Sequence, residues 1–191
     1  MRLFPQRQRI AGHGGASYDS ESEARASHVL ATHGIVRDTS GFLPVWFHDA
    51  DGQPFRAKAD FIHPPTGVRF EFKNSFLNPV KTQATATSQY ASSRCSSESM
   101  RYLKFSWSNA APKLALVQDG MARAGGALVA LLWREPDAAT IKGLNKRGTF
   151  WVVYGSPAWR SLLGFLTLRA HGLAATLTFS DDHGQPVHTF R

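Results

Sequence analysis

Three side chains in the stretch FRAKADFIHPPTGVRFEFK, residues 55–73, are of the types that hold a divalent cation and stabilise negative charge: Asp60, Glu71 and Lys73. Carboxylates are preferred ligands of Mg²⁺, whereas an ammonium group stabilises an anion. Acidic residues are scarce in this chain, with 14 Asp and Glu against 22 Lys and Arg. The other interpretation is an ordinary exposed strand face with an acid at the strand end, because so short a pattern also arises by chance.

A predicted β-hairpin brings these side chains together. A four-residue loop, 64–67, places Phe61 beside Phe70, so that the apolar side chains of both strands face one core. The same register sets Asp60 opposite Glu71, where two carboxylates repel each other unless a cation lies between them. Alternation also predicts one shared face for four apolar side chains of the first strand: Phe55, Ala57, Ala59 and Phe61.

A helix is predicted before this hairpin. Ser20 is a good N-cap and Gly34 a good stop, so that Glu21–His33 forms the helix. At about 100° per residue, Glu23 falls on the stripe that packs on the sheet, while Glu21 falls on the polar side. A buried acid requires a partner. Glu23 is therefore a third candidate acid, or else it closes a capping box with Ser20.

The remaining pattern alternates strands and helices. After the short segment 35–38, two strands surround the Asp51-Gly52 turn and the second runs into the hairpin. The elements predicted next are a helix over 78–92, a helix over 111–126, a buried strand over 127–133, a strand over 149–155, a helix over 157–172 and a strand over 173–180. The order helix, three strands, helix, strand predicts an α/β fold with a mixed central sheet flanked by helices.

Composition restricts the environment and the partners. The single cysteine, Cys95, fits a reducing compartment, and the longest apolar run, 127–133, is too short to span a bilayer. The N-terminus has no apolar block of signal-peptide length. These features predict a soluble, cytoplasmic protein with no membrane partner. The net charge of +8 over 191 residues favours a polyanionic partner such as nucleic acid.

The order of the candidate residues resembles the PD-(D/E)XK nuclease superfamily: a helix with an acid, then Asp60, then Glu71-Phe72-Lys73. The restriction-endonuclease-like core of that superfamily is helix, three strands, helix, strand. The resemblance therefore implies a nuclease core over 20–133. It leaves a basic N-terminal arm over 1–19 and a C-terminal extension over 134–191, packed on the core as a single domain overall.

The resemblance also implies roles for individual residues. Glu23, Asp60 and Glu71 would bind Mg²⁺, for which Mn²⁺ would substitute, with the Phe72 carbonyl as a further ligand. Lys73 would serve the attacking water and the charge that develops on the phosphate. Six other residues are candidates for contacts to nucleic acid: Lys81, Gln83, Arg94, Lys142, Lys146 and Arg147.

The implied activity is metal-dependent endonucleolytic hydrolysis of phosphodiester bonds in DNA, in a mobile-element, recombination, repair or restriction context. A nucleic-acid-binding module that keeps this fold without cutting is the main alternative. A hydrolase with paired carboxylates, such as a glycosidase, is disfavoured by the basic charge and by Lys73. A homodimer and a separate partner protein both stay open.

Overall fold

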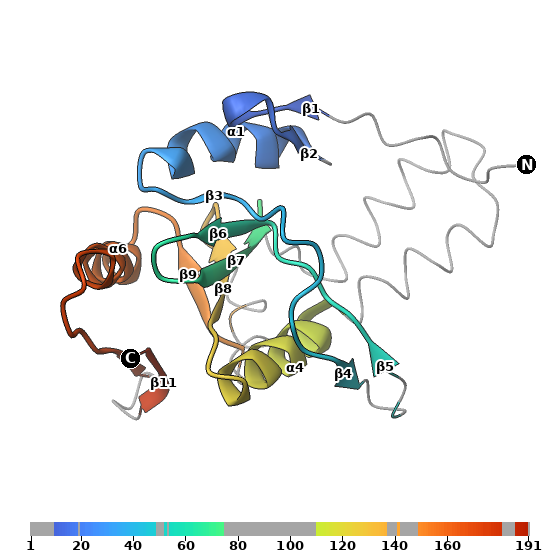
Figure 1. The fold of residues 1–191 in the computed structure, drawn as a ribbon, viewed down its shortest axis with the longest axis vertical. Coiled ribbons are helices and arrows are strands. Elements are labelled where there is room, and N and C mark those ends of the chain that lie inside the picture. Colours follow the sequence, from blue (N-terminus) through green and yellow to red (C-terminus); the bar gives the residue numbers. More distant parts are fainter. Residues whose placement is uncertain are drawn as a thin grey trace, which may run out of the picture.

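The computed structural model of the chain describes residues 10–18, 20–48, 52, 54–74, 110–136, 141, 149–180 and 186–190. These residues form a mixed α/β fold in which helices cover a central sheet (Figure 1). The α/β class with a mixed sheet was predicted, and it is confirmed. Within the described ranges, no helix is both long enough and apolar enough to cross a bilayer. The division into arm, core and extension stays a prediction.

The central sheet has five strands in the order β3-β6-β7-β8-β9. Their bounds are β3 Val36–Arg37, β6 Phe61–His63, β7 Val68–Lys73, β8 Leu128–Leu132 and β9 Trp151–Val153. The first three strands pair antiparallel, whereas β7, β8 and β9 run parallel. Both long strands lie in the interior of the sheet, so β7 carries its side chains onto two covered faces.

Three helices pack around this sheet, with α1 above it and α4 below it in Figure 1. They are α1 Glu21–Ala31, α4 Ala110–Arg123 and α6 Pro157–Ala170. The smaller elements at the two ends are β1 Ile10–Ala11, η1 His13–Gly15, β2 Ser17–Tyr18, β10 Leu177–Ser180 and β11 Pro186–Phe190. The helix predicted over 78–92 lies outside the described residues.

Helix α1 begins at its predicted N-cap and ends at Ala31, two residues before the predicted end at His33. The Ser20 hydroxyl accepts a hydrogen bond from the Glu23 amide at 3.2 Å, as the N-cap predicts. At the other end Gly34 has a φ of 71°, and the Ile35 amide turns back to the Leu30 carbonyl at 3.1 Å. A glycine takes this left-handed conformation at little cost, which is why the helix ends here.

The predicted hairpin register is confirmed, since Phe61 pairs with Phe70 across the four-residue loop 64–67. The strands on either side of Gly52 also pair, but these strands, β4 Phe47–His48 and β5 Pro54–Phe55, make a separate ribbon beside α4. The edge strand β3 takes the place in the central sheet that the sequence predicted for this ribbon. The sequence therefore identified the paired strands but assigned them to the wrong sheet.

Two apolar cores lie on opposite faces of the sheet. One lies between the sheet and α1 and α6, and it contains Phe61, Phe70 and Phe72. The other lies against α4, and it contains Phe55, Ala57 and Ala59. The predicted common face for 55, 57, 59 and 61 is therefore wrong. The chain bends at Asp60, and this bend turns Phe61 to the opposite face from Ala59.

Candidate active site

Strand β7 turns Glu71 and Lys73 away from the larger core. Phe70 and Phe72 are buried in that core, and the residues between them point to the α4 face. The Lys73 ammonium donates a hydrogen bond to Glu71 Oε1 at 2.5 Å, and both side chains are partly exposed. The structure thus joins two of the predicted site residues in one ion pair.

Asp60 stands at the end of the β6–β7 pairing, beside this ion pair. Its amide donates to the Phe70 carbonyl at 3.0 Å, and its Oδ2 accepts the Phe72 amide at 2.7 Å. The two bonds fix the backbone and the carboxylate of Asp60, respectively, against the strand that carries Glu71.

The pKa values of these groups reflect their surroundings. Burial, followed by the Glu71 carboxylate, raises the pKa of Asp60 to about 7, although Lys73 and the Phe72 amide act in the opposite direction. Burial lowers the pKa of Lys73, but the acids Glu71, Asp60 and Glu23 outweigh it, so that the pKa is raised. Two carboxylates and one ammonium therefore share a partly desolvated space.

The acid on α1 that faces this space is Glu23. It is half-buried, and its charge contributes to raising the pKa values of both Asp60 and Lys73. Glu21 instead pairs with Arg25 on the exposed side of the helix. The N-cap contact of the Glu23 amide and the closeness of its side chain to the site occur together. The N-cap bond from the Glu23 amide forms, whereas the choice between a site acid and a capping box for the Glu23 carboxylate stays open.

The oxygen donors suit a hard cation with a partly hydrated shell. The described residues contain no group of three or more His, Cys, Asp or Glu side chains that could hold a metal ion. Asp60 and Glu71 provide two carboxylates, and the Phe72 carbonyl lies on the same edge of β7 as the amide that bonds Asp60. Mg²⁺ is commonly held by one or two carboxylates and several waters, and this donor set fits that pattern.

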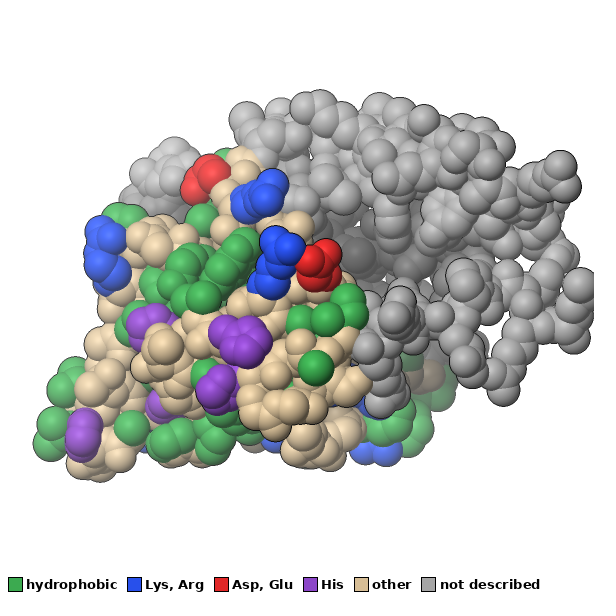
Figure 2. All heavy atoms as spheres, turned by 90° about the horizontal axis from the view of Figure 1, so that it is seen from above, with side chains coloured by type: hydrophobic (Ala, Val, Ile, Leu, Met, Phe, Trp, Pro, Cys, Tyr) green, Lys and Arg blue, Asp and Glu red, His purple; other side chains and the backbone are tan. Residues whose placement is uncertain are grey.

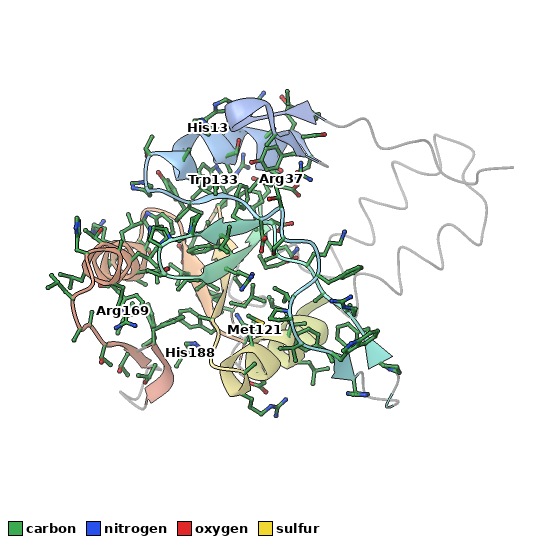
Figure 3. The ribbon with its side chains drawn as sticks, viewed as in Figure 1. His13, Arg37, Met121, Trp133, Arg169 and His188 are labelled. Atoms are coloured by element: carbon green, nitrogen blue, oxygen red, sulfur yellow. The ribbon has the colours of Figure 1, made fainter. Side chains whose placement is uncertain are left out.

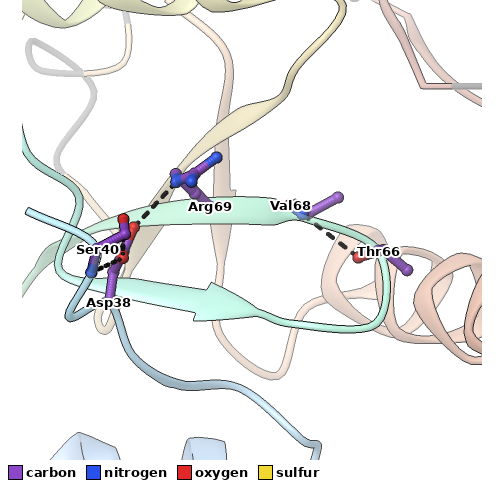
Figure 4. Close-up of polar contacts among 5 residues, drawn as sticks. All are labelled: Asp38, Ser40, Thr66, Val68 and Arg69. Atoms are coloured by element: carbon purple, nitrogen blue, oxygen red, sulfur yellow. Dashed lines mark hydrogen bonds and ion pairs between the residues drawn. The ribbon is translucent and has the colours of Figure 1, made fainter. Parts of the chain in front are cut away.

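Sequence analysis missed a buried ion pair beside the site. Arg69 Nε donates to Asp38 Oδ2 at 2.9 Å, and Asp38 also accepts the amide and hydroxyl of Ser40 (Figure 4). The side chain of Asp38 is 1% exposed and that of Arg69 is 19% exposed. The Asp38 amide donates to the Asp60 carbonyl at 3.0 Å, so the pair supports the bend at Asp60. The Asp-x-Ser pattern, typical of a side-chain-capped turn, was the available signal.

Aromatic side chains pack against the apolar face of β7, opposite Glu71 and Lys73. Phe72 lies 5.9 Å from Trp133 between ring centroids, and Trp133 stacks on Tyr154 at 4.3 Å. Trp133 lies below α1, whereas Met121 lies on the α4 side (Figure 3). The α1 side of the molecule shows a group of histidines (Figure 2), where the His13 and His28 rings are 5.9 Å apart. These two histidines lack a third ligand among the described residues.

The six residues predicted to contact nucleic acid all lie outside the described residues: Lys81, Gln83, Arg94, Lys142, Lys146 and Arg147. Two described clefts have lining residues that do not include the site. A cleft of about 810 Å³ lies at the opposite end of β7, where Arg69, Arg169 and His188 contribute to it. Arg169 and His188 come from α6 and β11 in Figure 3. A smaller groove of about 390 Å³ lies between β4 and α4.

Comparison of this chain with models of protein families, with curated proteins and with solved structures found no match.

Proposed function

We propose that the protein is a divalent-metal-dependent nuclease of the PD-(D/E)XK type that hydrolyses phosphodiester bonds in DNA. The observation that carries this proposal is the Lys73–Glu71 ion pair beside Asp60, whose pKa is raised to about 7. Perturbed acids beside a lysine are typical of catalytic sites. Apart from the β4–β5 ribbon between β3 and β6, the described elements follow the order α1, β3, β6, β7, α4, β8, which supports the proposed restriction-endonuclease-like core.

Each residue has a distinct task in this proposal. Asp60, Glu71 and the Phe72 carbonyl would hold Mg²⁺ or Mn²⁺, and Glu23 would act through water or on a second ion. A bound metal would polarise the phosphoryl oxygen and lower the pKa of a bound water. Lys73 lies at Glu71, so its ammonium is placed to orient that water and to stabilise the negative charge that develops on the phosphate.

A second candidate is a nucleic-acid-binding module that does not cut. The finding that favours it is the lack, within the described ranges, of a ready group of three metal-binding side chains. The presence of both predicted carboxylates and of the lysine in one place favours the nuclease. Cleavage assays separate the two candidates.

The test is plasmid cleavage with and without Mg²⁺. Lys73→Ala should lose about 10²–10³-fold in cleavage rate, as other single electrostatic groups do, while it keeps DNA binding and the rise in melting temperature with Mg²⁺. Glu71→Gln should lose both cleavage and the response to metal. Arg25→Ala is the control, because its side chain lies on the exposed side of α1. Equal cleavage by Lys73→Ala and the unaltered protein would refute the assignment.

A further inference from the structure

Two exposed aromatic rings and two cations form a strip next to the candidate site. We call Phe42, Trp46, Arg56 and Lys58 the aromatic–cation strip. Phe42 is 47% exposed and Trp46 is 61% exposed. The Arg56 guanidinium carbon lies 4.5 Å from the Phe42 ring centroid and 5.4 Å from that of Trp46, and Lys58 Nζ lies 4.8 Å from that of Phe42.

The fold holds this strip outward. The Leu43 amide donates to the Ala57 carbonyl at 2.8 Å, which fixes the loop with the rings against the segment with the cations. Phe55 and Ala57 pack in the core against α4, so Arg56 and Lys58 point to solvent. Of the acids that the structure describes, none pairs with either cation. Both charges are therefore available to an anionic ligand.

The strip leads directly to the candidate site. Lys58 precedes Asp60 by two residues, so their Cα atoms lie within about 7 Å of each other. On the far side, Trp46 lines the groove of about 390 Å³ against α4, and Arg123 contributes another exposed cation there. Trp46 thus lies between the groove that contains Arg123 and the cations of the 54–60 segment, which continues to Asp60.

We propose that the aromatic–cation strip binds single-stranded nucleic acid, with unpaired bases on Phe42 and Trp46 and phosphates on Arg56 and Lys58. The inference rests on the proposed function, because it names the kind of strand that reaches Asp60. A ring beside a cation offers stacking and charge together, which is how single strands are held without sequence preference. In a duplex the base faces are covered by their neighbours, so the rings would have nothing to stack on.

The binding test uses the full-length chain with Lys73→Ala and no divalent ion, so that no probe is cut. The probes are labelled oligothymidylate of about 20 nucleotides and a duplex of equal length. Trp46→Ala should weaken oligothymidylate binding about 5- to 100-fold, with about twofold or less change for the duplex. Trp46→Phe should retain most of the affinity, since a phenyl ring also stacks. Leu173→Ala, another exposed apolar side chain, should leave binding unchanged.

The contribution of Arg56 and Lys58 to binding is measured separately, by the salt dependence of the affinity. The log–log dependence of oligothymidylate affinity on salt should become shallower by about 0.7 for each phosphate that the protein no longer neutralises, so Arg56→Gln and Lys58→Gln should each reduce the slope by about that amount. Arg169→Gln, an exposed cation on α6, is the matched control and should leave the slope unchanged. Unchanged slopes in both strip variants would overturn the assignment of phosphates to these cations.

Three outcomes overturn the proposal outright: no binding of oligothymidylate, equal affinity of Trp46→Ala and its parent, and equal loss of affinity for single strand and duplex. Plasmid cleavage by the protein with its natural Lys73 is measured separately. If that protein fails to cut while Trp46→Ala loses single-strand binding, the proposed nuclease function falls and the strip is supported. If it cuts while Trp46→Ala binds normally, the strip falls and the nuclease function is supported.

Discussion

The two faces of strand β7 divide its six residues between opposite purposes. Val68, Phe70 and Phe72 are buried in the core below α1 and α6, where apolar area removed from water stabilises the fold. The residues between them point toward α4 and are all ionisable: Arg69, Glu71 and Lys73. The comparison shows that one strand can anchor the sheet and still present charges, because alternation separates the two tasks.

The charged face itself divides into two parts. At its start, Arg69 pairs with a buried Asp38 that also accepts two bonds from Ser40, so the charges are compensated. At its end, Glu71 and Lys73 share their surroundings with Asp60, whose pKa is raised first by burial and then by the Glu71 carboxylate. Charges that are paired with a counter-charge support a structure, whereas a carboxylate without its own counter-charge is able to bind a cation. The function of the face is therefore expected at its end.

Phe70→Ala, which truncates a side chain on the apolar face of β7, should cause the largest loss of stability. Phe70 is 0% exposed and lies in the centre of the sheet, so truncation removes transfer free energy and leaves a cavity. We expect a loss of about 3–5 kcal/mol in the free energy of unfolding. Denaturant titration measures it. Lys73→Ala, on the opposite face of the same strand, is the control, and a comparable loss there would contradict the division between the faces.

Arg69→Ala should have the next largest effect, although Arg69 is 19% exposed. Removal of the guanidinium leaves the Asp38 carboxylate buried without its charged partner, which should cost about 2–3 kcal/mol of unfolding free energy. The double variant Asp38→Asn with Arg69→Ala should recover part of that loss. A double variant as unstable as the sum of the single variants would show that the two residues do not interact.

Helix ends and local strand pairings were predicted from the sequence more accurately than the sheet to which each strand belongs. The N-cap at Ser20, the stop at Gly34 and the pairing of Phe61 with Phe70 follow from local chemistry and alternation, and all three are confirmed. The strands around Gly52 were placed in the wrong sheet. Local patterns fix a turn, but the partner of a strand depends on contacts with distant residues, such as α4.

The same limit applies to the candidate site. Spacing on the hairpin predicted that Asp60 and Glu71 would lie together, because the register of an antiparallel pair is a local property. The Asp38–Arg69 pair spans 31 residues of sequence, and no local rule joins them. Although Arg69 shares a strand face with Lys73, it cannot serve as a control for Lys73, because its removal would leave Asp38 without its partner.

The stability of the metal-free protein should fall as pH rises through about 7. The pKa of Asp60 is raised from its ordinary 3.8 to about 7, so the folded state binds the proton more tightly than the unfolded chain does. The resulting stability is fully present below about 4 and is lost as the carboxyl ionises near 7. Unfolding free energies at pH 5 and pH 8 measure the loss.

Asp60→Asn is the matched control for this pH effect, because its amide does not ionise. The unfolding free energy of the variant should depend less on pH. In the unaltered protein, Mg²⁺ should stabilise the fold more at pH 8 than at pH 6, since the cation requires the ionised carboxylate. An identical pH profile in the two proteins would remove Asp60 as the cause.

Arg25→Ala should have the smallest effect, and it sharpens the contrast with Arg69. Arg25 also pairs with an acid, Glu21, but its side chain is 78% exposed on the outer side of α1. Water solvates both partners when the pair is broken, and neither is left buried, so the cost should be about 0.3–0.5 kcal/mol. The loss should shrink further in high salt, which screens exposed charges, whereas the loss in Arg69→Ala should persist. Denaturant titrations at low and high salt test both statements. Equal costs for the two arginines would mean that burial does not separate the compensated pair beside the site from an ordinary surface contact.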